Sequence, residues 1–233
     1  MNPSYHSRFG LRVPLRRVGA GLLAVGCGCC SPVWAQIPGA VLNEILVINH
    51  SFTNTPGLRA AWIELRNPST QPFDLTDVSL SDDPAQPRRW FVPGNVSLPP
   101  GGAVVISCEA GAPPSTNSGG ILNTGFALKP GGGTLYLFDR PARGGMLLDA
   151  LAYGLQAADF SLGRVPNGTG TWGLCRPTPA GANLSASLGD PTLLRINEWM
   201  AAPESGEDWF ELYNPQSGPA AIGGCSLTDD LSQ

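Results

Sequence analysis

Apolar and polar residues alternate along several short segments of the chain. In residues 62–67, Ile63 and Leu65 alternate with Glu64 and Arg66, which is the period-two pattern of a half-buried β-strand. The same reading predicts strands at residues 41–48, 77–82, 88–92, 103–108, 134–139 and 146–153. No segment of ten or more residues has a clear helical period. The pattern therefore predicts an all-β domain of about eight short strands, as in a β-sandwich.

Turn-forming residues separate these segments. The chain contains 30 glycines and 23 prolines. Asn67 and Pro68 end the strand at residues 62–67, since proline cannot continue a hydrogen-bonded ladder. The phrases LPPGG and LKPGGG (residues 98–102 and 128–133) lead directly into the next strands. This composition favours many short strands joined by tight turns.

Three phrases occur twice, in the same order. WIELRNP (62–68) returns as WFELYNP (209–215), LNEI (42–45) as INEW (196–199), and VSLSDD (78–83) as CSLTDD (225–230). Loops of different length separate the paired phrases, which is typical of a duplicated domain. We therefore expect a β-sandwich domain at 40–183, a linker at 184–192, and the start of a second, incomplete copy at 193–233, so that the chain is interpreted as a fragment.

The N-terminus has the pattern of a secretory signal peptide. Arginines precede an apolar run at residues 18–30, and Val33 and Ala35 occupy the small-residue cleavage positions. The run is shorter than the roughly 20 residues that span a bilayer, so no transmembrane anchor is expected. We predict a signal peptide at 1–35 with cleavage after Ala35, and a secreted or cell-surface protein. A lipoprotein site at Cys27 is the alternative, and Arg16–Arg17 is a weak hint of twin-arginine export.

The strand phrases together resemble the lamin-tail domain, an immunoglobulin-like β-sandwich. The phrases that carry this resemblance are Asn43–Glu44, Trp62-Ile63-Glu64-Leu65, Asn67–Pro68, Ser81-Asp82-Asp83, Pro100-Gly101-Gly102, SLGRVPNGTGTW (161–172) and RPTPAGAN (176–183). Ala180 departs from the family pattern, because it stands between the last proline and glycine. The resemblance implies the immunoglobulin-like fold. It also implies an alternative function, since bacterial relatives are often appended to secreted hydrolases: the chain could be the accessory region of a nuclease-like or phosphoesterase-like enzyme whose catalytic domain lies beyond Gln233.

Paired carboxylates are the first candidates for chemistry. Glu44 and Glu64, repeated as Glu198 and Glu211, could in principle perform the acid–base work of glycoside hydrolysis. Each lies inside a predicted strand, and no companion acid or base motif follows it. We therefore expect these residues to lie on a polar strand face or to cap a nearby turn.

Metal ligands and nucleophiles are similarly scarce. Asp82–Asp83 and Asp229–Asp230 could offer oxygen ligands to calcium, but aspartate is also a preferred turn former, and no calcium-loop motif surrounds them. His50 lies in a predicted loop without a nucleophile elbow. Beyond the predicted cleavage site, one histidine and scattered cysteines do not make a zinc site. We therefore assign no catalytic, metal or cofactor residue and expect no enzyme activity.

Charge and cysteine content bear on nucleic-acid binding and on disulfide formation. Residues 37–186 carry nine basic and ten acidic residues, so the basic footprint that DNA binding requires is missing and no nucleic-acid partner is expected. Cys108 and Cys225 occupy apolar strand positions and are expected to be core thiols. In a secreted protein, Cys108 could also form a disulfide with Cys175.

The preferred interpretation is a secreted or cell-surface, non-catalytic module for interaction or assembly, with a protein or cell-envelope component as its partner. The hydrolase-accessory alternative stays open. A carbohydrate-binding module is a third reading, for which Trp90, Trp172 and Trp199 are candidates.

Overall fold

The computed structural model describes residues 39–52 and 59–228. The described chain divides into two compact units, and the boundary along the chain lies between Ala186 and Ser187. The predicted signal peptide and Asp229–Asp230 lie outside the described residues.

The first unit is built from short strands. In chain order these are β1 (Val41–Leu46), β2 (Ala61–Arg66), β3 (Phe73–Asp74), β4 (Ser79–Ser81), β5 (Trp90–Phe91), β6 (Ser97–Leu98), β7 (Ala103–Cys108), β8 (Leu122–Asn123), β9 (Gly133–Phe138), β10 (Leu147–Tyr153), β11 (Ser161–Val165), β12 (Thr171–Arg176) and β13 (Leu184–Ser185), with one 3₁₀ turn, η1 (Pro141–Arg143). The predicted all-β fold is confirmed.

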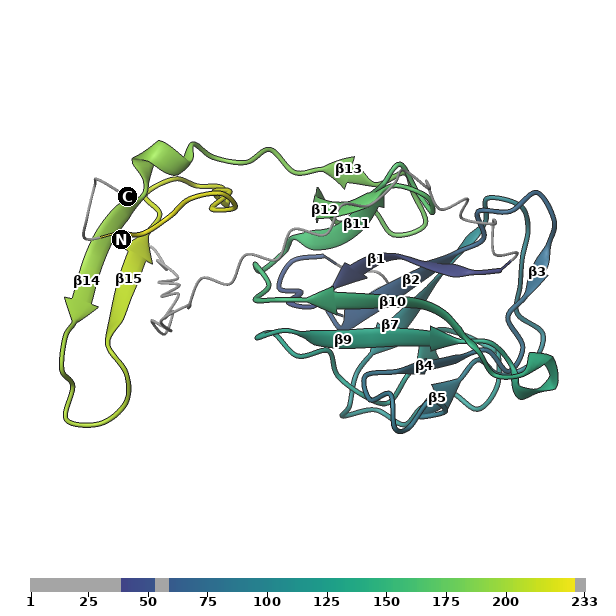
Figure 1. The fold of residues 1–233 in the computed structure, drawn as a ribbon. Coiled ribbons are helices and arrows are strands. Elements are labelled where there is room, and N and C mark those ends of the chain that lie inside the picture. Colours follow the sequence, from purple (N-terminus) through teal and green to yellow (C-terminus); the bar gives the residue numbers. More distant parts are fainter. Residues whose placement is uncertain (1–38, 53–58, 229–233) are drawn as a thin grey trace, which may run out of the picture. The chain divides into compact units, whose positions relative to one another are not determined.

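Two main sheets form the sandwich. One has the order β13-β12-β11-β1-β2-β7-β8, and the other has the order β10-β9-β4-β5. The pair β3–β6 forms a small separate sheet. Figure 1 shows β9 and β10 crossing in front of β2 and β7. Neighbouring strands in the two main sheets are antiparallel except for the parallel pair β7–β8. This arrangement of two packed sheets is an immunoglobulin-like sandwich.

The alternation of the sequence explains the core. Ile45, Ile63, Ile106 and Leu122 stand in register across β1, β2, β7 and β8 and are buried on one face of the larger sheet. They belong to one hydrophobic cluster with residues of the second sheet, among them Leu80, Leu135, Leu137 and Leu151. At roughly 1.5–3 kcal/mol for each fully buried aliphatic side chain, this cluster is the main source of stability.

Some strands differ from the prediction. Short strands such as β3, β6 and β8 were not predicted, because two residues are too few to show a period. The strand predicted at 88–92 is limited to Trp90–Phe91, since the turn before it continues as far as Arg89, whose N–H bonds to the carbonyl of Gln86. At the end of the unit, β13 pairs with β12, so ordered structure continues past residue 183.

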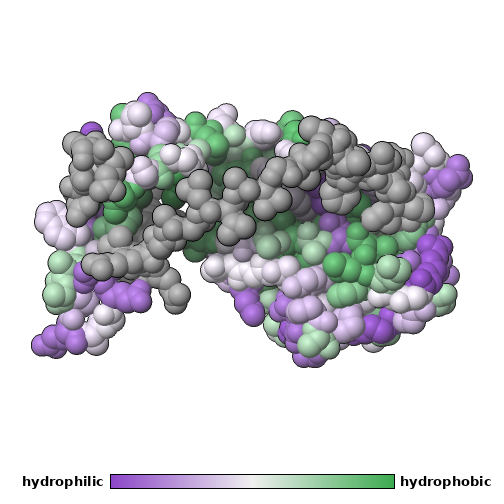
Figure 2. Space-filling model, in the orientation of Figure 1, coloured by the Kyte–Doolittle hydropathy of each residue, from purple (hydrophilic) through white to green (hydrophobic). Residues whose placement is uncertain are grey.

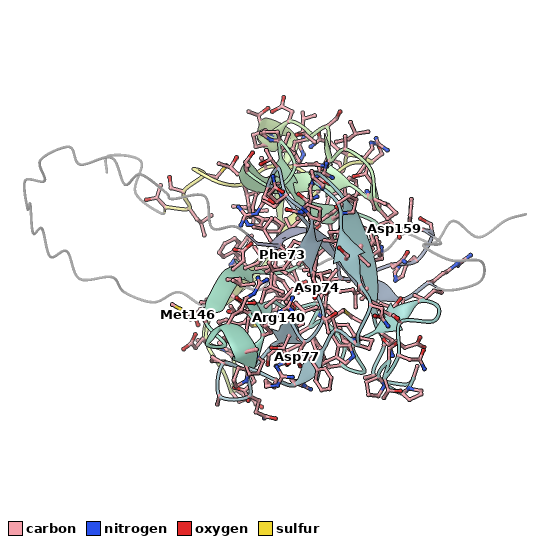
Figure 3. The ribbon with its side chains drawn as sticks, turned by 90° about the vertical axis from the view of Figure 1, so that its right-hand side faces the viewer. Phe73, Asp74, Asp77, Arg140, Met146 and Asp159 are labelled. Atoms are coloured by element: carbon pink, nitrogen blue, oxygen red, sulfur yellow. The ribbon has the colours of Figure 1, made fainter. Side chains whose placement is uncertain are left out.

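Ion pairs gather at one margin of the first unit. Figure 2 shows hydrophilic residues along the lower and right-hand margins, where Figure 1 places β5 and β3. Figure 3 labels Asp74, Asp77 and Arg140, which belong to these ion pairs. Arg140 pairs with Asp74, and Arg88 pairs with Asp77. Exposed pairs of this kind contribute little to stability.

The second unit repeats the geometry of β1 and β2 in a hairpin. Its strands are β14 (Arg195–Met200) and β15 (Trp209–Tyr213), preceded by the 3₁₀ turn η2 (Pro191–Leu193). Glu198 faces Glu211 as Glu44 faces Glu64, and an irregularity in register precedes the first glutamate of each pair. Asn197 bonds to Glu211 as Asn43 bonds to Glu64. The repeated phrases therefore form the same local structure twice.

The two hairpins differ in how far their apolar side chains are buried. Leu42 and Ile45 of β1 are fully buried, whereas the matching residues of β14, Ile196 and Trp199, are 57% and 74% exposed. Two strands without a packed face are marginal in water.

We expect hydrogen exchange to distinguish the two units. In the whole chain, amides of β1, β2 and β7 should exchange only through global unfolding, because their strands enclose the core. Amides of β14 and β15 should exchange orders of magnitude faster, since little apolar packing holds the hairpin closed. Exchange measured by mass spectrometry checks this. Equal protection across 195–213 and 41–66 would contradict it.

Candidate functional site

The two glutamates of the first unit are the most unusual feature of its structure. Glu44 on β1 stands directly opposite Glu64 on β2, and neither residue is exposed to solvent. Their side chains point away from the core face that carries Ile45 and Ile63, as the alternation predicted. The polar face is nevertheless covered. Buried carboxylates require hydrogen-bond donors, since burial of an unpaired charge is very costly.

The donors to Glu44 come from late in the chain. The Ser161 hydroxyl donates to Glu44 Oε1 at 2.6 Å. The backbone N–H of Thr178 donates to the same oxygen at 3.1 Å, and the Thr178 hydroxyl donates to Oε2 at 3.2 Å. These partners follow Glu44 by more than a hundred residues, so they fix the end of the domain against its first strand.

Glu64 is bound in the same way. Asn43 Nδ2 donates to Glu64 Oε1 at 2.6 Å, and the backbone N–H of Ala180 donates to Oε2 at 2.5 Å. Residues 176–183, here named the closing segment, thus supply backbone donors to both carboxylates. Ala180 has a left-handed backbone, with φ of 59°. The residue that departs from the family pattern therefore donates directly to Glu64.

Asparagines hold the closing segment in place. Asn183 Nδ2 donates to the carbonyls of Asn43 and Arg164, at 3.1 and 2.9 Å. Asn167 Nδ2 donates to the carbonyl of Gly181, and Asn167 Oδ1 accepts from the N–H of Asn183. These bonds surround the two glutamates with a polar network that the described residues complete among themselves.

Burial changes the acidity of both glutamates. It raises the pKa of Glu44 to about 7, against the lowering effect of the bonds from Ser161 and Thr178, and the neighbouring Glu64 raises it further. Burial also raises the pKa of Glu64, while Asn43, the N–H of Ala180 and Arg66 act in the opposite direction. Two facing carboxyls hold protons more tightly than separate ones do.

An ion pair joins the two sheets beside this network. Arg164 on β11 contacts both carboxylate oxygens of Asp149 on β10, each at 3.1 Å. Asp149 accepts the N–H of Leu42, and Arg164 Nε donates to the carbonyl of Leu42. The guanidinium also lies over the Trp172 ring, 4.8 Å from its centroid. Side chains therefore take the place of a strand partner where β1 is irregular.

The structure places the other candidate residues in turns or in the core. Asp82 pairs with Arg89, and Asp83 accepts the N–H of Ala85 and the amide of Gln86 within the following turn. Within residues 39–52 and 59–228, no three histidine, cysteine or acidic side chains cluster as metal ligands would. The backbone N–H of His50 donates to Asp159, which is labelled in Figure 3.

The three tryptophans have different environments. Trp90 is buried in the core, and its Nε1 donates to the carbonyl of Ser115. Trp172 is half-buried against Arg164. Trp199 alone of the three is strongly exposed, on β14. They do not form one aromatic platform.

The cysteines of the described chain are free thiols. Cys108 on β7 and Cys175 on β12 belong to one sheet, but β11, β1 and β2 lie between their strands. Strands are spaced by about 4.8 Å, so the two Cα atoms lie far beyond the 4.4–6.8 Å that a disulfide requires. The possible Cys108–Cys175 disulfide is therefore excluded within one chain. Cys225 is exposed, so the prediction that it lies in a core is wrong for this structure.

Sequence reasoning noticed the glutamates but did not predict the covering of their strand face. The alternation of β2 indicates which side Glu64 takes, but not what lies above it. In the sequence, residues 176–183 indicate only the family resemblance, although Thr178 and Asn183 in this proline-containing segment are potential hydrogen-bond donors. None of the described helical turns is long or apolar enough to cross a membrane.

The raised pKa values predict a pH-dependent stability. The folded state holds a proton on Glu44 up to about pH 7, whereas the unfolded state releases it near 4.5. The stabilisation is therefore complete below pH 4.5 and is lost as the pH rises through 7. We expect Tm to fall by about 5–10 °C between pH 5 and pH 8. Thermal unfolding followed by circular dichroism measures this.

A matched pair of variants tests the assignment. Glu44→Gln keeps the shape of the protonated side chain and should flatten the pH dependence. Glu109→Gln, outside the network, should retain it. An unchanged slope in E44Q would show that another group is responsible. Glu44→Ala should lower the free energy of unfolding by about 2–4 kcal/mol, because Ser161 and Thr178 would lose their acceptor.

Comparison with known proteins identifies the family. Residues 41–154 match the family model described as Lamin Tail Domain. No curated protein and no solved structure gave a match. The matched range begins at β1 and ends just after β10, so β11 and the closing segment lie beyond it. Through residues 41–154, the chain belongs to the lamin-tail-domain family.

Proposed function

We propose that the first unit is a non-catalytic interaction or assembly module, and that the protein works at the cell surface or outside the cell. The lamin-tail family supports an immunoglobulin-like interaction domain. The signal-peptide pattern of residues 1–35 supports export. The partner in this proposal is a protein or another component of the cell envelope.

The proposal that the module is non-catalytic rests on one observation. Glu44 and Glu64, the paired carboxylates of the first unit, are fully buried, and their oxygens accept bonds from Ser161, Thr178, Asn43 and Ala180. A general acid or base must come within hydrogen-bond reach of its substrate. The network instead gives these carboxylates a structural role.

The alternatives receive less support from the structure. A carbohydrate-binding platform needs exposed aromatic rings. Trp90 is buried in the core, and Arg164 lies over the ring of Trp172. Of the three candidate tryptophans, only Trp199 is therefore strongly exposed. A hydrolase-accessory role is compatible with the same interaction surface, and it would add a catalytic domain rather than replace the module.

An activity screen tests the proposal. The purified chain should hydrolyse none of a set of phosphodiester, ester and glycoside substrates above the buffer rate. Glu44→Gln and Glu109→Gln serve as a matched pair. Turnover that copurifies with the protein and disappears in E44Q but not in E109Q would refute the structural role of the glutamates.

A further inference from the structure

Strand β7 is paired unequally on its two sides. On one side β2 pairs with it along its whole length, from Ala103 to Cys108, without an irregularity in register. On the other side β8 pairs only with Ile106 and Ser107. Among the described strands, none therefore pairs with residues 103–105 on that second side.

The direction of the backbone groups follows from the neighbouring bonds. The carbonyl of Gly102 accepts from Asn67 on the β2 side, whereas the carbonyl of Ser107 accepts from Thr124 on the β8 side. Backbone groups alternate in direction along a strand. Ala103 and Val105 therefore direct their N–H and C=O groups to the β8 side. The parallel pairing of Ile106 with Leu122 uses the Val105 carbonyl, which leaves the Val105 N–H and both backbone groups of Ala103 at the open part of the edge.

A cleft lies at this place. Its volume is about 460 Å³. It is lined by residues 95–97, 118 and 120–122 together with Val104 and Val105 of β7. Of the residues that line it, Val96, Val104, Val105, Ile121 and Leu122 are apolar, Asn95, Ser97 and Ser118 are polar, Gly120 has no side chain, and none is charged.

We propose that this cleft binds an extended, uncharged peptide segment of a partner protein, which adds a strand beside Ala103–Val105. The proposal rests on the interaction function proposed above and specifies its surface. Strand addition satisfies a row of free backbone groups, while side-chain pockets give specificity. The lining favours small β-branched and hydroxyl side chains, and desolvation in an uncharged cleft disfavours acidic and basic ones.

The edge lacks the usual protection against such pairing. Natural sheets guard open edges with lysine, proline, bulges or a covering element. Residues 103–108 contain no lysine or proline, and Ile121 at the cleft is 47% exposed. An open, regular and uncharged edge is the form of surface that strand addition requires.

A defined peptide tests the proposal on the whole chain. The probe is acetyl-Ser-Thr-Val-Thr-Val-Ser-amide, and its control is the same peptide methylated at every backbone nitrogen, which cannot donate to the edge. Amide shifts of the ¹⁵N-labelled protein should move at Ser97, 103–105 and 120–122, with a Kd below about 1 mM. The methylated peptide should cause no shifts.

Two variants locate the site. Ile121→Glu places a charge in the cleft and should weaken binding at least about tenfold. Leu155→Glu, at a position 58% exposed and not among the lining residues, should bind as the unchanged protein does. Equal binding of the methylated peptide, no shifts at about 1 mM probe, or self-association through residues 103–105 would overturn the proposal. Those outcomes leave the interaction function standing, whereas hydrolase activity dependent on Glu44 would remove its non-catalytic premise.

Discussion

The first unit depends on the burial of two facing carboxylates. Glu44 and Glu64 stand side by side on neighbouring strands, with no exposure to water. A buried carboxylate is tolerated only when it is protonated or supplied with donors. The chain meets this requirement with residues far along the sequence, among them Ser161, Thr178 and Ala180. The polar face of β1 and β2 therefore specifies how the domain must end.

Closure of the sandwich follows from the same requirement. The closing segment can reach the glutamates only after β11 and β12 have extended the larger sheet beside β1. Arg164 then joins that extension to β10 of the second sheet through Asp149. The matched family range ends before these elements, yet the glutamates within it rely on them. The use of both carboxylates in this closure supports the proposal that they have a structural role.

Much of the fold could be predicted from local patterns, but the site could not. The alternation of Ile63 and Leu65 with Glu64 gives the strand and its core face, and Asn67–Pro68 gives its end. The covering of the opposite face depends on contacts more than a hundred residues away, which no local period records. The paired β3 and β6 are too short to show a period, and the distance between Cys108 and Cys175 depends on strand order. The repeated phrases predicted a second, incomplete copy. Its β14–β15 hairpin repeats the pairing of β1 and β2, but Ile196 and Trp199 are exposed, because packing and not pattern decides burial.

The burial of Glu44 and Glu64 beneath the closing segment can be measured by titration of their carboxyl groups. Glutamate side chains labelled with ¹³C can be followed by NMR from pH 3 to pH 9 together with the backbone amides of the closing segment. We expect Glu44 to titrate near pH 7, and the amides of Thr178 and Ala180 to shift with the titration of the pair. Titration of both glutamates near pH 4.5, with those two amides unaffected, would contradict the buried pair and the role of the closing segment.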